Sequence, residues 1–187
     1  MEENISENNL NIWQLIDHFY PENNELRKIL LIHSWQVTKK ALQITRKHLE
    51  LSVNRQLLFE GAMIHDIGIF LTDAPGINCY GEHPYILHGY LGGQLLRNNG
   101  LEHLARFCER HTGAGISTND IELQHLPLPE GQYMPETIEE QIVCYADKFF
   151  SKSSIWREKS PEQAYNSLLN FGEEGATRFL KWHQLFK

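Results

Sequence analysis

The stretch Ala62-Met63-Ile64-His65-Asp66-Ile67-Gly68-Ile69-Phe70 places an imidazole and a carboxylate side by side within an apolar run. Apolar runs normally enter the protein core, and burying an unpaired carboxylate there has a large free-energy penalty. The run therefore predicts that His65 and Asp66 have partners that make their burial tolerable.

Length, charge and composition limit the classes of protein that fit this chain. It has 187 residues, which suits one domain with a substantial core. The formal net charge is −7 and no stripe is dense in lysine or arginine, which argues against a nucleic-acid backbone as partner. A small phosphorylated substrate remains compatible, because bound metal ions supply local positive charge.

The cysteines and the apolar segments indicate the compartment. Three widely spaced cysteines, at positions 79, 108 and 144, predict no disulfide framework and a reducing environment. We find no basic and apolar leader and no apolar run of about 20 residues, so we expect a cytoplasmic protein that does not bind membranes. Gly89 and Gly93 form a GxxxG motif, but their segment holds His and Gln, which excludes a membrane-helix interpretation.

Helical periodicity dominates the chain and predicts an all-α fold, a compact single-domain bundle of about six main helices. The predicted helices span residues 25–49, 53–67, 84–98, 101–111, 136–151 and 161–187. Gly68 is predicted to end the second helix as a C-terminal glycine, and Gly172 and Gly175 to kink or split the last. Residues 71–83 and 112–135 are predicted loops, the longer one a functional loop or lid.

Three regions follow from these elements. Residues 1–24 are interpreted as an N-terminal extension or short helix, 25–152 as the core that carries the metal ligands, and 153–187 as a helical segment that packs on it. The aromatic residues of the last region either close the core or form the face of a homodimer.

Four histidines and two aspartates occur on the apolar faces of five predicted helices: His33, His65, Asp66, His88, His111 and Asp147. A single histidine on such a face is more often an ordinary core residue, whereas aspartate is almost never buried unless it is paired or binds a cation. No lysine or arginine shares the inward faces of the first four of these helices, so a divalent metal is the compensating charge that remains. Imidazole and carboxylate ligands without thiolate suit Fe, Mn, Zn, Co or Ni. Six ligands favour one octahedral ion, or two ions bridged by Asp66.

The other histidines provide a comparison. We interpret five of them as surface residues because their neighbours are polar or close to a terminus: His18, His48, His103, His125 and His183. His83, directly before Pro84, is either a pocket residue that contacts substrate or a plain loop histidine.

The order of the six residues resembles the H…HD…H…H…D pattern of the HD-domain superfamily of metal-dependent phosphohydrolases. His65-Asp66-Ile67-Gly68 matches HDIG, the commonest form of the central motif, and the segments at His88-Gly89 and His111-Thr112-Gly113 resemble the six-ligand subgroup that holds two metals. The resemblance covers roughly residues 25–152. It implies a first metal held by His33, His65, Asp66 and Asp147, and a second held by His88 and His111, with Asp66 bridging the two.

One position departs from the family pattern. Many relatives carry Lys or Arg directly after HDIG, whereas this chain has Ile69. Lys148 either replaces that cation at the substrate phosphate or is a solvated surface lysine.

The resemblance implies hydrolysis of a phosphate ester or anhydride of a nucleotide or other small phosphorylated metabolite, by a metal-bound hydroxide that Asp66 helps to orient. Two alternatives stay open. A di-iron oxygenase of the same fold would use the same ligands on a small diol or phosphonate, and a non-catalytic module would bind nucleotides without turnover. Substrate specificity is expected to lie in residues 71–87 and 112–135.

Overall fold

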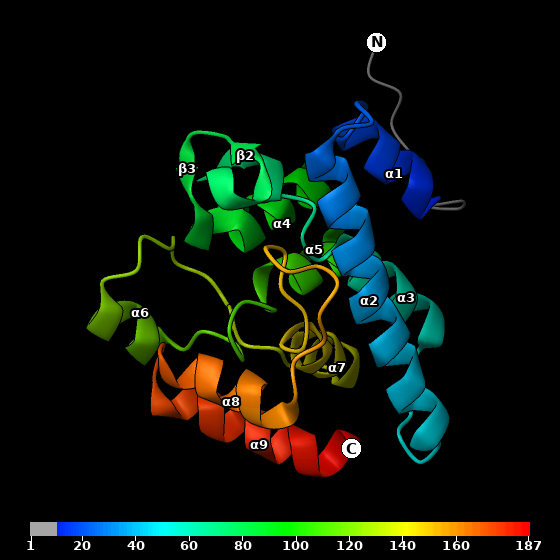
Figure 1. Cartoon of the computed structure of the whole chain (residues 1–187), viewed down its shortest axis with the longest axis vertical. Helices are drawn as coiled ribbons and strands as arrows, with labels where there is room; N and C mark the ends of the chain where they lie inside the picture. The colour runs from blue at the N-terminus through cyan, green and yellow to red at the C-terminus, as the bar shows by residue number, and fades with distance from the viewer. Residues whose placement is uncertain (1–10) are drawn as a thin grey trace.

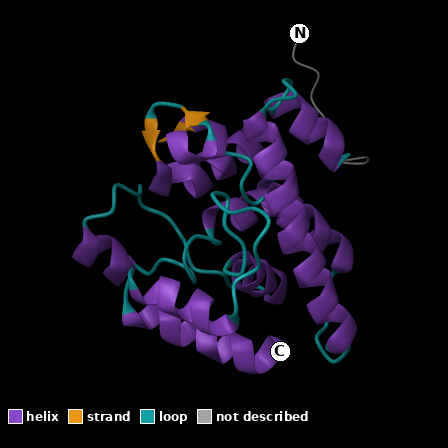
Figure 2. Cartoon of the chain, in the orientation of Figure 1, coloured by secondary structure: helices purple, strands orange, loops and turns teal. Residues whose placement is uncertain are grey.

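The computed structural model describes residues 11–187, and the first ten residues of the predicted N-terminal extension lie outside the described part. The described chain is mainly helical, which confirms the predicted all-α fold (Figures 1 and 2). The helices are α1 (Ile12–Phe19), α2 (Glu25–Lys47), α3 (Arg55–Ile64), α4 (His88–Asn98), α5 (Glu102–Glu109), α6 (Thr118–Gln124), α7 (Ile138–Asp147), α8 (Pro161–Leu169) and α9 (Glu173–Phe186).

Polar side chains set where the core helices begin. Asn24 and Asn54 accept hydrogen bonds from backbone N–H groups in the first turns of α2 and α3. Thr137 and Glu140 form a capping box at the start of α7. These side chains satisfy N–H groups that have no partner inside the helix, so each start is determined locally by sequence.

The core lies where α2, α3, α5 and α7 pack together, with α4 against α5. The α8–α9 pair runs along one side of the molecule (Figure 1), and α9 packs on α7. Phe179 of α9 is fully buried and stacks on Tyr145 of α7, with ring centroids 5.3 Å apart. The C-terminal aromatic side chain therefore helps to close the core.

The predicted loop at 71–83 is wrong in part, because it contains a small sheet (Figure 2). The strands are β1 (Thr72–Ala74), β2 (Cys79–Tyr80) and β3 (His83–Pro84), in the order β2-β1-β3. β1 pairs antiparallel with β2 and parallel with β3. A 3₁₀ turn at Tyr85–Leu87 follows, so α4 begins at His88 and not at Pro84 as predicted.

One further element differs from the prediction and one agrees with it. Helix α6 lies inside the predicted loop 112–135, where Ser117 and Asp120 form a capping box. The last predicted helix is split into α8 and α9 at Gly172, as predicted, and the φ of 127° at Gly172 is strained for any residue with a side chain.

Gly68 does not have the role predicted for it. Helix α3 ends at Ile64, and Gly68 has a φ of −86°, which needs no glycine. Instead, a Cβ atom at this position would lie 2.4 Å from the backbone nitrogen of Gly92 and 2.4 Å from the carbonyl oxygen of His88. The absence of a side chain therefore lets the turn after α3 lie directly against the backbone of α4.

The glycines of α4 pack inside the chain. A Cβ at Gly89 would meet the carbonyl oxygen of Cys108 in α5 at 2.4 Å, so the GxxxG spacing serves close contact between α4 and α5. No helix in residues 11–187 combines the length and the apolar character that crossing a bilayer requires. All three cysteines are free and buried. The sequence predicts no disulfide framework for them.

Candidate metal centre

The turn that follows α3 carries His65 and Asp66 into the centre of the molecule, where both are fully buried. Backbone hydrogen bonds tighten this turn, from the N–H of Ile67 to the carbonyl of Ile64 and from that of Ile69 to the carbonyl of Asp66. The hydroxyl of Tyr20 donates to the carbonyl of Ile67 at 2.8 Å. The sequence neighbours His65 and Asp66 therefore converge on one place in a fixed geometry.

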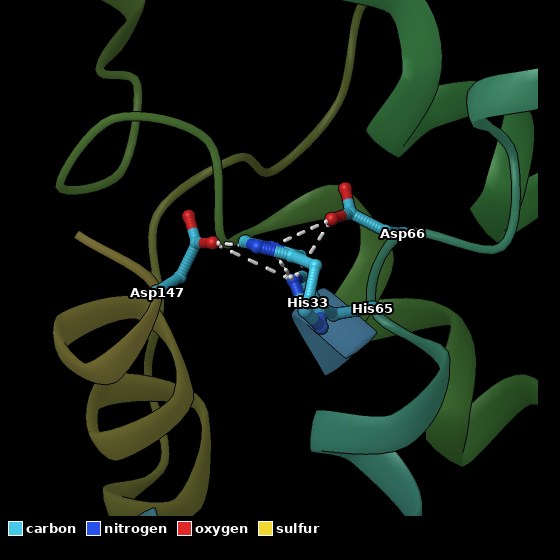
Figure 3. Close-up of side chains that lie close together, drawn as sticks. All are labelled: His33, His65, Asp66 and Asp147. Carbon is cyan, nitrogen blue, oxygen red and sulfur yellow. Dashed lines mark hydrogen bonds and ion pairs between the residues drawn. The ribbon is translucent and has the colours of Figure 1, made fainter. Parts of the chain in front are cut away.

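The first cluster contains His33, His65, Asp66 and Asp147, which come from α2, the turn after α3, and the end of α7 (Figure 3). Nε2 of His33 lies 3.1 Å from Oδ2 of Asp66 and 2.9 Å from Oδ1 of Asp147. Nε2 of His65 lies 3.1 Å from Oδ2 of Asp66 and 3.6 Å from Oδ1 of Asp147. Four potential ligand atoms thus surround one small volume between α2 and α7.

The second cluster contains Asp66, His88 and His111. Nε2 of His88 lies 3.5 Å from Oδ1 of Asp66, and Nε2 of His111 lies 3.3 Å from the same oxygen. Asp66 therefore directs Oδ2 to the first cluster and Oδ1 to the second. A carboxylate in this orientation can bridge two cations.

Backbone carbonyls orient three of the four imidazoles. Nδ1 of His65 lies 2.7 Å from the carbonyl of Ala62, Nδ1 of His88 lies 2.7 Å from that of Tyr85, and Nδ1 of His111 lies 2.8 Å from that of Cys108. A carbonyl only accepts, so each Nδ1 carries a hydrogen and each Nε2 of a neutral ring presents a lone pair. This is the usual way in which a ligand histidine is held in place.

The paired imidazoles fit a bound cation. Nε2 of His88 and Nε2 of His111 lie only 3.0 Å apart in the buried interior. Two lone pairs at this distance repel each other unless a positive charge lies between them or beside them. The donor set, imidazole nitrogen with carboxylate oxygen, is one that divalent transition ions accept.

The charges of the first cluster reinforce one another. Burial disfavours the carboxylate of Asp66, but Lys152 and His65 outweigh it and hold the pKa of Asp66 well below its usual range. Burial likewise opposes the charge of Asp147, and Lys148 with the histidines lowers the pKa of Asp147. Burial lowers the pKa of His65, but the carboxylates more than compensate and raise it to about 9.

The second cluster behaves differently. Burial and the neighbouring His111 lower the pKa of His88 to about 3. Burial also lowers the pKa of His111. Both rings are therefore neutral at pH 7 and have lone pairs available for a ligand.

Comparisons with known proteins identify the family and the fold. A family model for the HD domain matches residues 30–151, well over half of the chain. The chain belongs to the HD-domain family. HD domains bind divalent metals, and the two buried clusters of this HD domain are able to hold them. A crystal structure of the HD domain of the L. monocytogenes phosphodiesterase PgpH has the same fold, with a TM-score of 0.54, 18% identity, and coverage of 92% of this chain and 86% of that one.

Curated relatives share sequence with parts of this HD domain. The chain is 36% identical over 133 residues to a tRNA (cytidine(56)-2'-O)-methyltransferase of Picrophilus torridus, and 33% identical over 156 residues to the enzyme of that name from Thermoplasma volcanium. The matches cover 70% and 83% of this chain but only 34% and 41% of those relatives. An uncharacterised protein of Methanocaldococcus jannaschii is 40% identical over 108 residues, which is 57% of this chain and 55% of that protein.

Lys152 is the residue at the centre that the sequence prediction missed. Its ammonium lies 2.6 Å from Oδ2 of Asp66, and its side chain is 11% exposed. The prediction looked for the compensating charge on the inward faces of helices, whereas Lys152 lies after α7 in an irregular segment. Its position five residues beyond Asp147 was the only available signal.

Lys148 and His83, the two predicted substrate-binding residues, lie in different surroundings. The ammonium of Lys148 lies 2.8 Å from Oδ2 of Asp147 and 3.2 Å from the carbonyl of His111. Lys148 is thus no freely solvated lysine. His83 is exposed in β3 and belongs to neither cluster.

The remaining histidines and Ile69 differ in how far they are exposed. His18, His103 and His125 are exposed, as predicted, whereas His48 and His183 are half-buried because of packing near the C-terminus. His183 accepts or donates a hydrogen bond with the hydroxyl of Tyr145 at 2.8 Å. The side chain of Ile69 is fully buried in the core and is not exposed to solvent.

Proposed function

We propose that this HD domain is a metal-dependent phosphohydrolase that cleaves a phosphate ester or anhydride of a nucleotide or another small phosphorylated metabolite. The observation that carries the proposal is the orientation of Asp66, whose two carboxylate oxygens face two separate sets of imidazoles. Two divalent transition ions, drawn from Fe, Mn, Zn, Co and Ni, would occupy the two clusters.

The residues of such a site would have different roles. When bound, the ions would supply a water of lowered pKa and positive charge for the phosphoryl oxygens. Asp66 would act as the catalytic carboxylate, because its two oxygens would position both ions relative to each other. Lys148 forms an ion pair with Oδ2 of Asp147, which leaves Oδ1 of that residue for the first cluster.

The surroundings of the centre favour an anionic substrate. A cleft of about 450 Å³ opens beside the first cluster, and its lining includes Asp147, Lys152 and Lys159. This volume lies in the range of small-molecule sites. A compact phosphorylated molecule is therefore the proposed substrate. Lys148 and His83 stay proposed contacts from the sequence alone, because neither lines this cleft.

The activity named for the two methyltransferase relatives belongs to proteins of which this chain spans only about a third to two fifths. The family match occupies residues 30–151 of this chain, which include all six candidate ligands. We propose that these relatives share an HD domain with this protein and that methyl transfer depends on their other parts.

The test is a phosphatase assay on protein purified without chelators and reloaded with Mn, Fe, Co, Ni or Zn. Release of phosphate from a panel of nucleotides, sugar phosphates and a phosphodiester supports the proposal if Asp66→Ala abolishes both activity and metal content. Asp73→Ala changes an exposed carboxylate outside the clusters and should preserve both. Full metal loading without hydrolysis of any substrate would contradict the proposal.

The four imidazoles also suit iron, which keeps the di-iron oxygenase as a second candidate. Anaerobic loading with Fe(II), followed by oxygen uptake on small diols and phosphonates, separates the two functions. Tight nucleotide binding without phosphate release or oxygen uptake would instead indicate a binding module.

A further inference from the structure

Three lysines lie between the end of α7 and the start of α8: Lys148, Lys152 and Lys159. The segment from Lys148 to Lys159 passes beside the first cluster, and Lys152 and Lys159 both line the cleft of about 450 Å³. Lys152 points to Asp66 and Lys148 to Asp147. Among the described residues that line this cleft, Lys152 and Lys159 are the two with a positive charge.

The contact between Lys152 and Asp66 competes with metal binding. Oδ2 of Asp66 receives the ammonium at 2.6 Å and is also the oxygen that faces His33 and His65. A divalent cation on that oxygen would lie close to the ammonium, and repulsion between such charges is strong in a buried site. Binding of the cation thus favours release of Lys152 from Asp66.

The cleft can receive the released side chain. Lys152 lies in an irregular segment, has a flexible four-carbon stem, and already lines the cleft. The ring of Tyr85 lies on the same side, 5.9 Å from the ammonium. A cation that moves into the cleft needs an anion there to replace Asp66.

The charge of Lys159 also favours an anion in the cleft. Burial and the neighbouring charge of Lys148 lower the pKa of Lys159. An anion in the cleft would relieve this repulsion. Two cations that line one cleft beside a candidate metal centre suit a phosphate group, which offers several charged acceptor oxygens.

We propose that Lys152 and Lys159 form the phosphate-binding subsite of this HD domain, and that Lys152 exchanges Asp66 for the substrate phosphate when a cation binds. The proposal rests on the proposed function and supplies the cation that position 69 lacks. It differs from a purely structural role of Lys152, because it requires this lysine to oppose metal binding and to favour phosphate binding.

The experiment measures two affinities by calorimetry, neither of which requires turnover. Lys152→Met keeps the length of the side chain and removes the charge. We expect it to bind Mn²⁺ at least threefold more tightly, and to bind inorganic phosphate in the Mn²⁺-loaded state at least tenfold more weakly. Lys159→Met should weaken phosphate binding at least threefold and leave Mn²⁺ affinity unchanged.

Lys39→Met provides the matched control, because Lys39 is exposed on α2 outside the cleft. It should change neither affinity. Unchanged phosphate affinity in both cleft variants, or weaker Mn²⁺ binding in Lys152→Met, would overturn the proposal. If phosphate binding depends on both lysines but no phosphate ester is hydrolysed, the proposed function fails while the subsite stands.

Discussion

Replacing Gly68 by alanine tests how the two clusters are held at their present separation. The new Cβ would lie 2.4 Å from two backbone atoms of α4, whereas ordinary contact begins at 3.4 Å, so α4 and the turn must separate by about 1 Å. His88 is the first residue of α4 and would move with it. Metal–ligand distances tolerate only about 0.2 Å, so affinity for an ion in the second cluster should fall at least tenfold.

The first cluster has no ligand on α4, although His65 and Asp66 lie on the turn itself, so affinity for its ion should fall less than affinity for the ion of the second cluster. Overpacking of this size should lower the free energy of unfolding by about 1–3 kcal/mol, a decrease in Tm of roughly 2–12 °C. Metal titration by calorimetry and thermal unfolding of the metal-free protein measure the two effects. Gly76→Ala is the control, because a Cβ there meets nothing within 4 Å. Two undisturbed ions and an unchanged Tm in Gly68→Ala would refute the reasoning.

Three further predictions concern charge and packing. Asp66→Asn removes the negative charge shared by both clusters, so metal content measured by mass spectrometry should fall from about two ions per chain to below one, with the helical circular dichroism retained. Because the pKa of His65 is about 9, this ring is protonated at pH 6 without metal, and loading should release about one proton per chain, since a ligand histidine must be neutral. The pKa of His88 is about 3, so this ring has no proton to release at pH 6, and His88→Asn should leave the number of protons released on metal loading unchanged. Calorimetry in buffers of different ionisation enthalpy measures that number. Release of almost no protons by the unmodified protein would contradict the assignment of His65 as a ligand that is protonated before metal binds. Phe179→Ala should cost about 3–5 kcal/mol in urea unfolding, while Leu180→Ala, at a 41% exposed position, should cost less than about 1 kcal/mol; equal costs would show that α9 does not close the core.

The ligands on helices could be predicted because a helix repeats every 3.6 residues. His33 and Asp147 follow apolar residues three and four positions earlier, so their inward direction is readable from sequence. The structure brings all six candidate residues into two buried clusters that share Asp66. Their binding of metal stays a prediction.

The features that were missed depend on short elements or on distant neighbours. Strands of two or three residues, as in β1 to β3, are too short to show alternation. The close contact of Gly68 with Gly92 joins positions far apart in sequence, which no local pattern reveals. Helix α6 did have a local signal, since Ser117 and Asp120 have the spacing of a capping box.

Lys152 illustrates the limit of arguments from amphipathic helices. It lies beyond the end of α7, where no periodicity indicates the direction of a side chain, yet its ammonium contacts the most buried carboxylate of the centre. The prediction that a metal is the sole compensating charge therefore needs correction. A lysine compensates Asp66 in the absence of metal.

The most direct test of this account is the anomalous scattering of crystals loaded with Mn²⁺ or Fe²⁺ and measured at the absorption edge of the metal. The account predicts two peaks, one among His33, His65, Asp66 and Asp147 and the other among Asp66, His88 and His111, with Asp66 between them. A single peak, or a peak away from Asp66, would contradict the bridged two-metal centre.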